Sequence, residues 1–327
     1  MLTLRRGTVT AVRDRLDGLA RLEVNGEPCI AYVDLTGPVE EGDDVLVNVQ
    51  ARELELGSGG FDVLYANLTR GLGLPAETGA HVMKLPYTPQ QFAVRHGEEK
   101  GPLAPSLDGI PVVACSLHSQ VAPVCAALRG RRVAYVQLEG GALPVALSDT
   151  LRALRAAGLV EVAIGAGACF GGDVDAVSVF SALALARGHG ADAIVASIGP
   201  GIVGTATAIG HGGTAAASAL FASNALGGRG VLALRVSGAD ARERHRGVSH
   251  HSAAVLALVA GVPHEVAWPA GCPVGAVPRG AVEVDVSGWE AACDGLPLGH
   301  MGRGREDDPW FFAAAFAAGR LAAEGRG

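Results

Sequence analysis

The polar residues best suited to catalysis gather in one segment, residues 237–252, which reads SGADARERHRGVSHHS. Ser249 has the residue type of a helix N-cap, which places His250 and His251 in the first helical turn. The positive end of the helix dipole disfavours a charged imidazole there, so both rings should be neutral and able to act as bases or ligands. The segment supplies three more candidates, for proton transfer and anion binding: His245, Arg242 and Arg246. The alternative is a solvated basic loop that ends in a capped helix.

Three polar residues from other loops could join this site: His118, Glu139 and Asp173. His118 is a further candidate for moving protons, and the two carboxylates could orient a histidine or bind a metal. Adjacent histidines do not share one helix face, so a metal would need ligands from several loops. A ring satisfied by hydrogen bonds within the core is the alternative for His118. No residue pattern identifies a particular metal or cofactor.

Glycines in two loops are candidates for anion binding: Gly199, Gly201 and Gly204 in one, and Gly167 and Gly171 in the other. The first three have G-x-G-x-x-G spacing between an apolar run and an Ala- and Thr-rich run. That order predicts a strand, a turn and a helix start whose free backbone N–H groups suit phosphate or carboxylate. The alternative is that these glycines serve tight turns and close packing. A dinucleotide site would also need an acidic residue about 20 positions on, and position 224 is Asn.

The elements that position these loops follow from the hydrophobic pattern after Ile110. Apolar runs such as PVVACSL, RRVAYVQLE, EVAIGAG, AIVASI and GVLALRVSG alternate with runs of helical length, and HEVAW and VEVDV follow. Short continuous apolar strands that alternate with helices indicate a parallel sheet covered on both faces. We therefore predict an α/β fold with a doubly wound, mostly parallel sheet. Its ligands should bind at the carboxyl ends of the strands, where the candidate loops fall.

The first 70 residues predict a small β-barrel instead. GTVTAVRD, LARLEV, CIAYVDL, VLVN and FDVLYANL read as five short strands, and Asn25-Gly26 is a hairpin signal. Residues 71–109 are rich in Gly, Pro and polar residues and predict a linker. The expected domains are the barrel at 1–70, the loop-rich linker at 71–109 and a Rossmann-like α/β domain at 110–327. We expect the barrel to serve packing or dimerisation.

Composition limits the class of protein. A net charge of −7 and a pI near 5.8 argue against a nucleic-acid partner. No apolar run approaches the ~18 residues of a membrane span, and no signal peptide is recognisable. The six cysteines have no metal-site spacing and should be buried thiols. We expect a cytoplasmic protein with no membrane or nucleic-acid partner. Its terminal run DPWFFAAAFAAGRLAAE could cap the core or form a homodimer contact.

Several longer motifs carry a resemblance to a known family: MKLPYTPQQ, SLHSQVAP, EGGALPVALSD, FGGDVDAVSVFSAL, GPGIVGTATAIGHGG, NALGG and RHRGVSHH. In this order they resemble an uncharacterised bacterial family known only as a domain of unknown function. The similarity covers nearly the whole chain. It implies no activity, because the family has none established.

The residues therefore favour an enzyme that acts on a small anionic metabolite, phosphorylated or nucleotide-like. Hydrolysis is the leading reaction class and group transfer the second. A sensor that binds a nucleotide or metabolite without turnover is the alternative. A structural protein whose glycines only pack is the third hypothesis.

Overall fold

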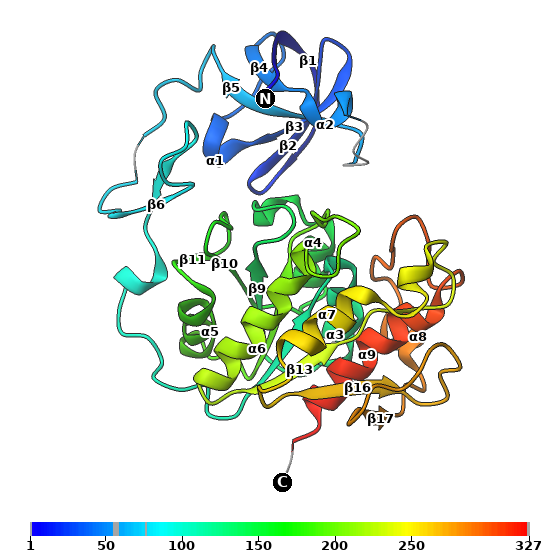
Figure 1. The fold of residues 1–327 in the computed structure, drawn as a ribbon. Helices are drawn as coiled ribbons and strands as arrows, with labels where there is room; N and C mark the ends of the chain where they lie inside the picture. Colours follow the sequence, from blue (N-terminus) through cyan, green and yellow to red (C-terminus); the bar gives the residue numbers. More distant parts are fainter. Residues whose placement is uncertain (1, 55–58, 76, 326–327) are drawn as a thin grey trace. The chain divides into compact units, whose positions relative to one another are not determined.

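The computed structural model describes residues 2–54, 59–75 and 77–325 of the chain. It contains two compact units, Met1–Arg95 and His96–Gly327 (Figure 1). The first unit holds an all-β barrel, and the second holds a parallel sheet with helices. Within the described ranges, no helix has both the length and the apolar character needed to cross a membrane.

Five strands of the first unit close into a barrel, which confirms the sequence prediction. Their order is β1-β2-β3-β5-β4, with β3 and β5 parallel and the other neighbours antiparallel. This is the strand order of the OB fold, a small Greek-key barrel. Asn25 and Gly26 both have positive φ in the predicted hairpin turn. The elements are β1 (Leu4–Leu16), β2 (Leu19–Val24), β3 (Glu27–Tyr32), α1 (Val33–Thr36), β4 (Asp44–Asn48), α2 (Gln50–Glu53) and β5 (Asp62–Asn67).

The arginines of the barrel are paired with carboxylates. Residues 1–70 contain seven arginines and twelve acidic residues, and every one of these arginines forms an ion pair with a carboxylate. The most buried carboxylate is Asp43, which accepts hydrogen bonds from Arg70 and Asn67.

Residues 71–109 contain short regular elements. In the first unit, β6 (Val82–Lys84) pairs antiparallel with β7 (Phe92–Val94). The 3₁₀ helix η1 (Gly97–Glu99) lies in the second unit. Leu107 is fully buried, and its N–H donates to the carbonyl of Leu226, so the end of this segment belongs to the α/β core.

The second unit is built on an eight-stranded sheet in which all neighbouring strands are parallel. Its order is β11-β10-β9-β12-β8-β13-β16-β17, so β8 lies between β12 and β13. After β8 the chain forms β9, β10 and β11 on one side and then inserts β12 between β9 and β8. It then adds β13, β16 and β17 on the other side of β8. Such a reversal opens a crevice at the carboxyl ends of the strands. The strands are β8 (Pro111–Cys115), β9 (Val133–Leu138), β10 (Val162–Ala166), β11 (Val174–Ala176), β12 (Ala193–Ile198), β13 (Arg229–Ala233), β16 (Glu265–Pro269) and β17 (Val282–Val284).

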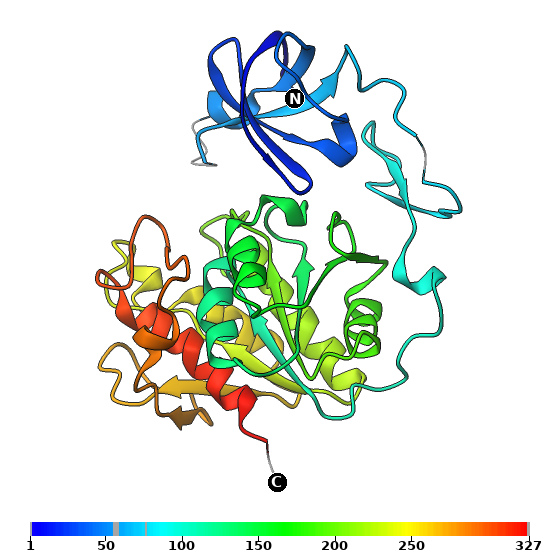
Figure 2. The same cartoon turned by 180° about the vertical axis from the view of Figure 1, so that it is seen from behind.

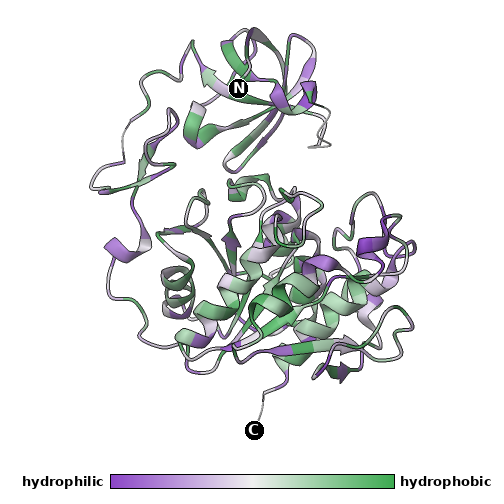
Figure 3. Ribbon diagram, in the orientation of Figure 1, coloured by the Kyte–Doolittle hydropathy of each residue, from purple (hydrophilic) through white to green (hydrophobic). Residues whose placement is uncertain are grey.

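Helices cover both faces of this sheet, as opposite views show (Figures 1 and 2). α5, α6 and α7 pack on one face, and α3, α4, α8 and α9 on the other. Alternate residues of β8 enter the two cores, which explains the continuous apolar strands that Figure 3 shows in green. The helices are α3 (Val121–Ala127), α4 (Asp149–Ala156), α5 (Val179–Gly188), α6 (Ala215–Ala225), α7 (His250–Leu258), α8 (Trp289–Ala292) and α9 (Pro309–Ala323). Phe311, Phe312 and Phe316 of α9 are buried, so this helix caps the core.

Two differences from the predicted elements matter for the site. The residues of β11 are expected to belong to a helical run, because three residues are too few to show a strand pattern. The run GVLALRVSG is expected to be one strand but ends as β13, and a separate short strand, β14 (Val236–Ser237), pairs with β15 (Gly247–Val248). Arg235 lies at the break between the two strands. The six cysteines are free, as expected, and all but Cys272 are buried.

Candidate metal centre

Three histidine side chains meet in the chain segments that follow the two neighbours of β8. His211 comes after β12, while His250 and His251 come after β13. One imidazole nitrogen from each lies within 4.8 Å of the other two. His245 completes the group, with its ring centre 4.7 Å from that of His250 and 4.9 Å from that of His251. We call these four residues the histidine cluster.

A single serine fixes half of the cluster. The hydroxyl of Ser249 accepts a hydrogen bond from the backbone N–H of His251 at 3.2 Å, which confirms the predicted N-cap of α7. The same hydroxyl lies 2.7 Å from Nδ1 of His245. The β14–β15 hairpin returns the chain to this point, and the polar segment between its strands appears purple in Figure 3. Ser249 thus holds both the start of α7 and the ring of His245.

His211 is held from a different loop. It forms an isolated β-bridge with Gly204 and precedes the 3₁₀ helix η4 (Gly212–Thr214). Its ring stacks on that of His251 with 3.9 Å between the centres. Its Nε2 donates to the carbonyl of Ala208 at 3.1 Å, so Nδ1 carries a lone pair. Metal-bound histidines commonly donate their other ring N–H to a carbonyl in this way.

Two ring nitrogens of the cluster are buried without a partner among the described residues: Nδ1 of His211 and Nε2 of His250. A buried polar atom without a hydrogen bond costs about 1–3 kcal/mol. Two such atoms at one point therefore mark a place where a ligand would stabilise the fold.

Burial keeps the cluster neutral. It is the largest cause that lowers the pKa of each of the four rings, to about 3 for His245 and about 2 for His251. The charge of Arg235 acts in the same direction on all four. Neutral rings near pH 7 are expected from the sequence, but burial rather than the helix dipole is the main cause. Neutral imidazole is the form that binds a metal.

Arg235 is a charged residue within hydrogen-bond distance of the cluster. Its Nη1 donates to Nδ1 of His251 over a long 3.3 Å, and its Nη2 donates to the buried Asp240 at 2.9 Å. Arginine has no lone pair to offer. A metal bound to Nδ1 of His251 would take the lone pair that accepts the hydrogen bond from Arg235. A metal bound to Nε2 would require the proton to be on Nδ1, where it would point at the N–H of Arg235. Metal binding at His251 and the hydrogen bond from Arg235 therefore exclude each other.

Asp240 is the centre of a buried charge network. Its carboxylate accepts from Arg235, from Arg242 at 3.0 Å and from Arg303 at 3.1 Å. Burial raises the pKa of Asp240, but its hydrogen bonds and ion pairs with arginines outweigh this and lower the pKa below its usual range. A second carboxylate, Asp308, accepts from Ser237 and Gly238 and lies 3.4 Å from Nε of Arg303. These five residues are the Asp240 network: Arg235, Asp240, Arg242, Arg303 and Asp308.

His118 lies in the core instead of an open site. Its Nε2 is 2.6 Å from the hydroxyl of Ser148, and its Nδ1 is 3.2 Å from the carbonyl of Ile198. Burial lowers its pKa to about 4. Both ring nitrogens have hydrogen-bond partners within the core, which is the alternative to a catalytic role for His118.

The two carboxylates predicted to help this site have other partners. Glu139 accepts a hydrogen bond at 2.8 Å from the backbone N–H of Ala168 and so ties two loops together. Asp173 forms two 2.8 Å hydrogen bonds with Arg155 and accepts another from Ala163 at the start of β10. The expected place of Asp173 at the carboxyl ends of the strands is wrong, because the loop has already returned to the amino end, where β11 begins.

The predicted glycine turn does not lead into a helix. Gly199, Gly201 and Gly204 follow β12 as expected, but α6 begins only at Ala215. The chain between them is a loop, so the glycines do not form the start of α6. A Cβ atom on Gly199 would overlap the carbonyl of Ala142. Close backbone packing, the stated alternative, explains this glycine.

The other predicted anion-binding groups already have partners within the chain. The N–H of Gly167 donates to the carbonyl of Ala176, and the N–H of Gly171 lies 3.4 Å from a carboxylate oxygen of Asp175. Arg242 is bound to Asp240 through its side chain, while Nε of Arg246 donates to the backbone carbonyl of Asp240. Of the arginines in this segment, only Arg244 has no hydrogen bond or ion pair from its side chain to another described residue.

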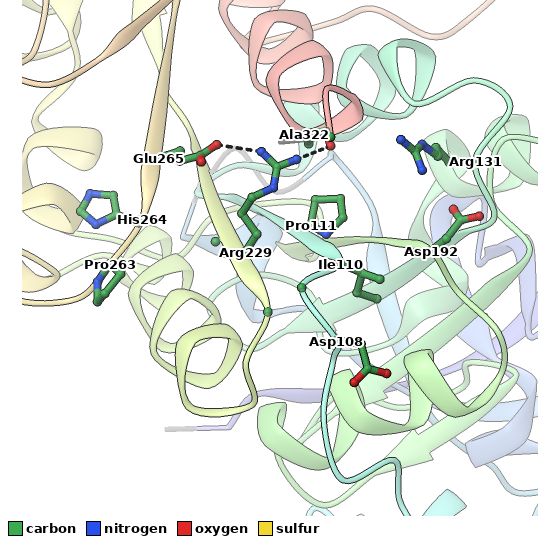
Figure 4. Close-up of a pocket in the computed structure, with 14 residues that line it drawn as sticks. Asp108, Ile110, Pro111, Arg131, Asp192, Arg229, Pro263, His264, Glu265 and Ala322 are labelled. Atoms are coloured by element: carbon green, nitrogen blue, oxygen red, sulfur yellow. Dashed lines mark hydrogen bonds and ion pairs between the residues drawn. The ribbon is translucent and has the colours of Figure 1, made fainter. Parts of the chain in front are cut away.

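A cavity of about 710 Å³ lies at the opposite edge of the sheet (Figure 4). It is lined by residues at the amino ends of β8, β13 and β16, including Pro111, Arg229 and Glu265. Arg229 is paired there with Glu265 at 2.8 Å and with carbonyl groups at the end of α9. The amino ends of the strands are not where doubly wound sheets bind ligands.

His211 and Arg235 are the residues that the sequence reasoning missed. His211 is flanked by glycines in the run IGHGG after a predicted strand, and a polar side chain in a glycine loop at a strand end is a usable signal. Arg235 interrupts the apolar run GVLALRVSG, and a charged residue at a buried strand end must find a counterion.

Comparison with known families places this geometry in a family without an assigned role. The family model described as "Protein of unknown function (DUF3866)" matches residues 28–319. The chain belongs to this family. The match begins within β3 of the barrel and ends within α9, so it covers parts of both units and the segments that carry the histidine cluster. Among curated proteins, none matches the chain.

Proposed function

We propose that the protein is a metal-dependent hydrolase of a small anionic metabolite, with His211, His250 and His251 as the metal ligands. The observation that carries the proposal is the meeting of three neutral imidazoles within 4.8 Å, two of them with a buried, unpartnered nitrogen. Three histidines with an open fourth position form a known type of catalytic zinc site. The location after β12 and β13 also fits the crevice that this strand order creates.

The donor set restricts the metal. Imidazole nitrogens without a carboxylate favour zinc, cobalt, nickel or copper over magnesium or calcium. A tetrahedral zinc ion with bonds of about 2.1 Å would hold its ligand nitrogens roughly 3.4 Å apart. The three atoms would therefore have to close by about 1.4 Å at most, which is within the reach of side-chain rotation in a loop and at a helix start. Binding at His251 would also break its 3.3 Å hydrogen bond with Arg235.

The reaction that such a site supports is attack by water. A bound zinc ion lowers the pKa of a coordinated water to about 7 and so supplies hydroxide near neutral pH. The hydroxide oxygen would bond to the phosphorus or carbonyl carbon of the substrate while the bond to the leaving group breaks, and the leaving group takes a proton from solvent. We assign His245 to positioning, because its Nδ1 lies 2.7 Å from the hydroxyl of Ser249, which caps the start of α7 where His250 and His251 lie.

The first test is metal content. The full chain is purified without chelator and compared with His211→Gln, while His189→Gln serves as a control because His189 is exposed after α5. We expect one zinc or cobalt ion per chain in the wild type and in the control, and a loss of at least tenfold in metal affinity in His211→Gln. Circular dichroism checks that the variant is folded.

The second test is hydrolysis of 4-nitrophenyl phosphate by the metal-loaded chain. Turnover that disappears with chelator, returns with zinc and is absent from His211→Gln supports the hydrolase. Equal metal content in wild type and His211→Gln would overturn the centre. Metal binding without turnover of this ester or a panel of phosphate and carboxylate esters would favour the sensor hypothesis instead.

A further inference from the structure

The Asp240 network, which touches the histidine cluster, carries surplus positive charge. In the Asp240 network three arginines face two carboxylates, and the network touches the cluster through Arg235 and His251. The four histidines are neutral and balance none of this charge. A divalent metal would add two further positive charges, so a loaded centre calls for an anion.

Arg244 is the guanidinium of this loop that is free to bind such an anion. It belongs to the 3₁₀ helix η5 (Glu243–His245) and directly precedes His245, whose ring is 4.7 Å from that of His250. Its side chain is exposed and makes no ion pair or hydrogen bond with any described residue, unlike Arg242 and Arg246 on the same loop. Its charge is also close enough to His250 to lower the pKa of that ring.

We infer that Arg244 binds the phosphoryl group of a phosphorylated substrate at the histidine cluster. This inference rests on the proposed function, because the metal supplies the second contact to the anion. A phosphate monoester dianion fits better than a carboxylate for two reasons. It balances more of the surplus charge, and its oxygens can accept two parallel N–H bonds from one guanidinium while another oxygen binds the metal.

The test uses cobalt as a visible probe of the centre. The full chain is loaded with Co²⁺, and its visible absorption is followed while inorganic phosphate or, separately, acetate is added. We expect phosphate to shift the spectrum at concentrations at least tenfold lower than acetate. In Arg244→Gln the phosphate dissociation constant should rise at least tenfold with unchanged cobalt content. Arg129→Gln is the matched control, because Arg129 is exposed after the end of α3 and has no ion pair with a described residue.

The outcomes separate this inference from the proposed function. If Co²⁺ does not bind, the metal centre fails and the inference fails with it. If Co²⁺ binds but Arg244→Gln takes up phosphate as tightly as wild type, the role of Arg244 is refuted and the metal centre stands. If acetate binds as tightly as phosphate, the phosphoryl assignment is refuted.

Discussion

Replacement of His118 by glutamine should change how the stability of the α/β unit depends on pH. In the wild type the buried ring is neutral, with its Nδ1–H donated to the carbonyl of Ile198 and its Nε2 paired with Ser148. Burial lowers its pKa to about 4 from an ordinary value of 6.5. The glutamine side chain cannot titrate and removes this dependence.

The sign and size follow from proton linkage. Between pH 6.5 and 4 the unfolded chain binds a proton at His118 that the folded chain does not, so the free energy of unfolding falls as the pH falls. One pKa unit corresponds to about 1.4 kcal/mol, so the full difference amounts to roughly 3 kcal/mol. At pH 7 the variant should be less stable than wild type by about 1–3 kcal/mol, because it loses buried hydrogen bonds. At pH 4 the wild type has lost roughly 3 kcal/mol that the variant keeps, so the variant should be as stable as the wild type or more stable by up to about 2 kcal/mol.

Urea denaturation in the presence of EDTA from pH 4 to 8 measures this difference. Trp268, Trp289 and Trp310 all lie in the second unit, so tryptophan fluorescence reports on its unfolding alone. The other buried histidines titrate equally in both proteins and cancel in the comparison. A stability difference between wild type and His118→Gln that stays constant from pH 7 to 4 would refute the reasoning.

Three further predictions concern packing and charge. Gly212→Ala places a methyl group against the carbonyl of Gly140 and should lower the free energy of unfolding by about 2 kcal/mol or more. Gly261→Ala is the control, because a methyl group there meets no atom within 4 Å. Equal midpoints of the two variants in thermal unfolding would contradict the close backbone contact at Gly212. Asp240→Asn leaves Arg235 buried without its charged partner and should cost about 3–5 kcal/mol by urea denaturation, whereas a loss below ~1 kcal/mol would show that the network is well solvated. Asp43→Asn should make the barrel more susceptible to limited proteolysis at unchanged tryptophan fluorescence, and a fluorescence change would show that the two units unfold together.

The sequence predicts most of the architecture because local signals agree with tertiary demands. In the barrel, alternating residues and the Asn25-Gly26 turn specify the strands and one hairpin register. In the α/β unit, continuous apolar runs such as Ala193–Ile198 are explained by burial on both faces. The order of the strands in the sheet is not written in these runs, since it depends on which helices pack together.

The glycine loop after β12 shows where local signals are ambiguous. A strand followed by G-x-G-x-x-G and small residues fits both an anion turn and a close backbone crossing. The threonines that follow the glycines prevent the helix start that an anion-binding turn would need. Thr205 and Thr207 hydrogen-bond to each other, and each bonds to the backbone of Gly210, so the chain stays in a loop and the helix starts only at Ala215. Serine and threonine compete with helix formation through such local bonds.

The histidine cluster could not be found by spacing because its members come from two strand ends. The rule that adjacent histidines do not share a helix face is correct along the side of a helix, yet it does not apply at the helix start. His250 and His251 occupy the first turn of α7, and His211 contacts both rings from the loop after β12, with ring centres 5.4 and 3.9 Å away. In the first turn, two adjacent rings can therefore lie close together, here with centres 4.4 Å apart, and both contact a third group placed at the helix end. When two neighbouring histidines directly follow an N-cap, a further histidine should be sought in a loop at the same edge of the sheet. In this protein that loop follows β12, which is separated from β13 by one strand, β8.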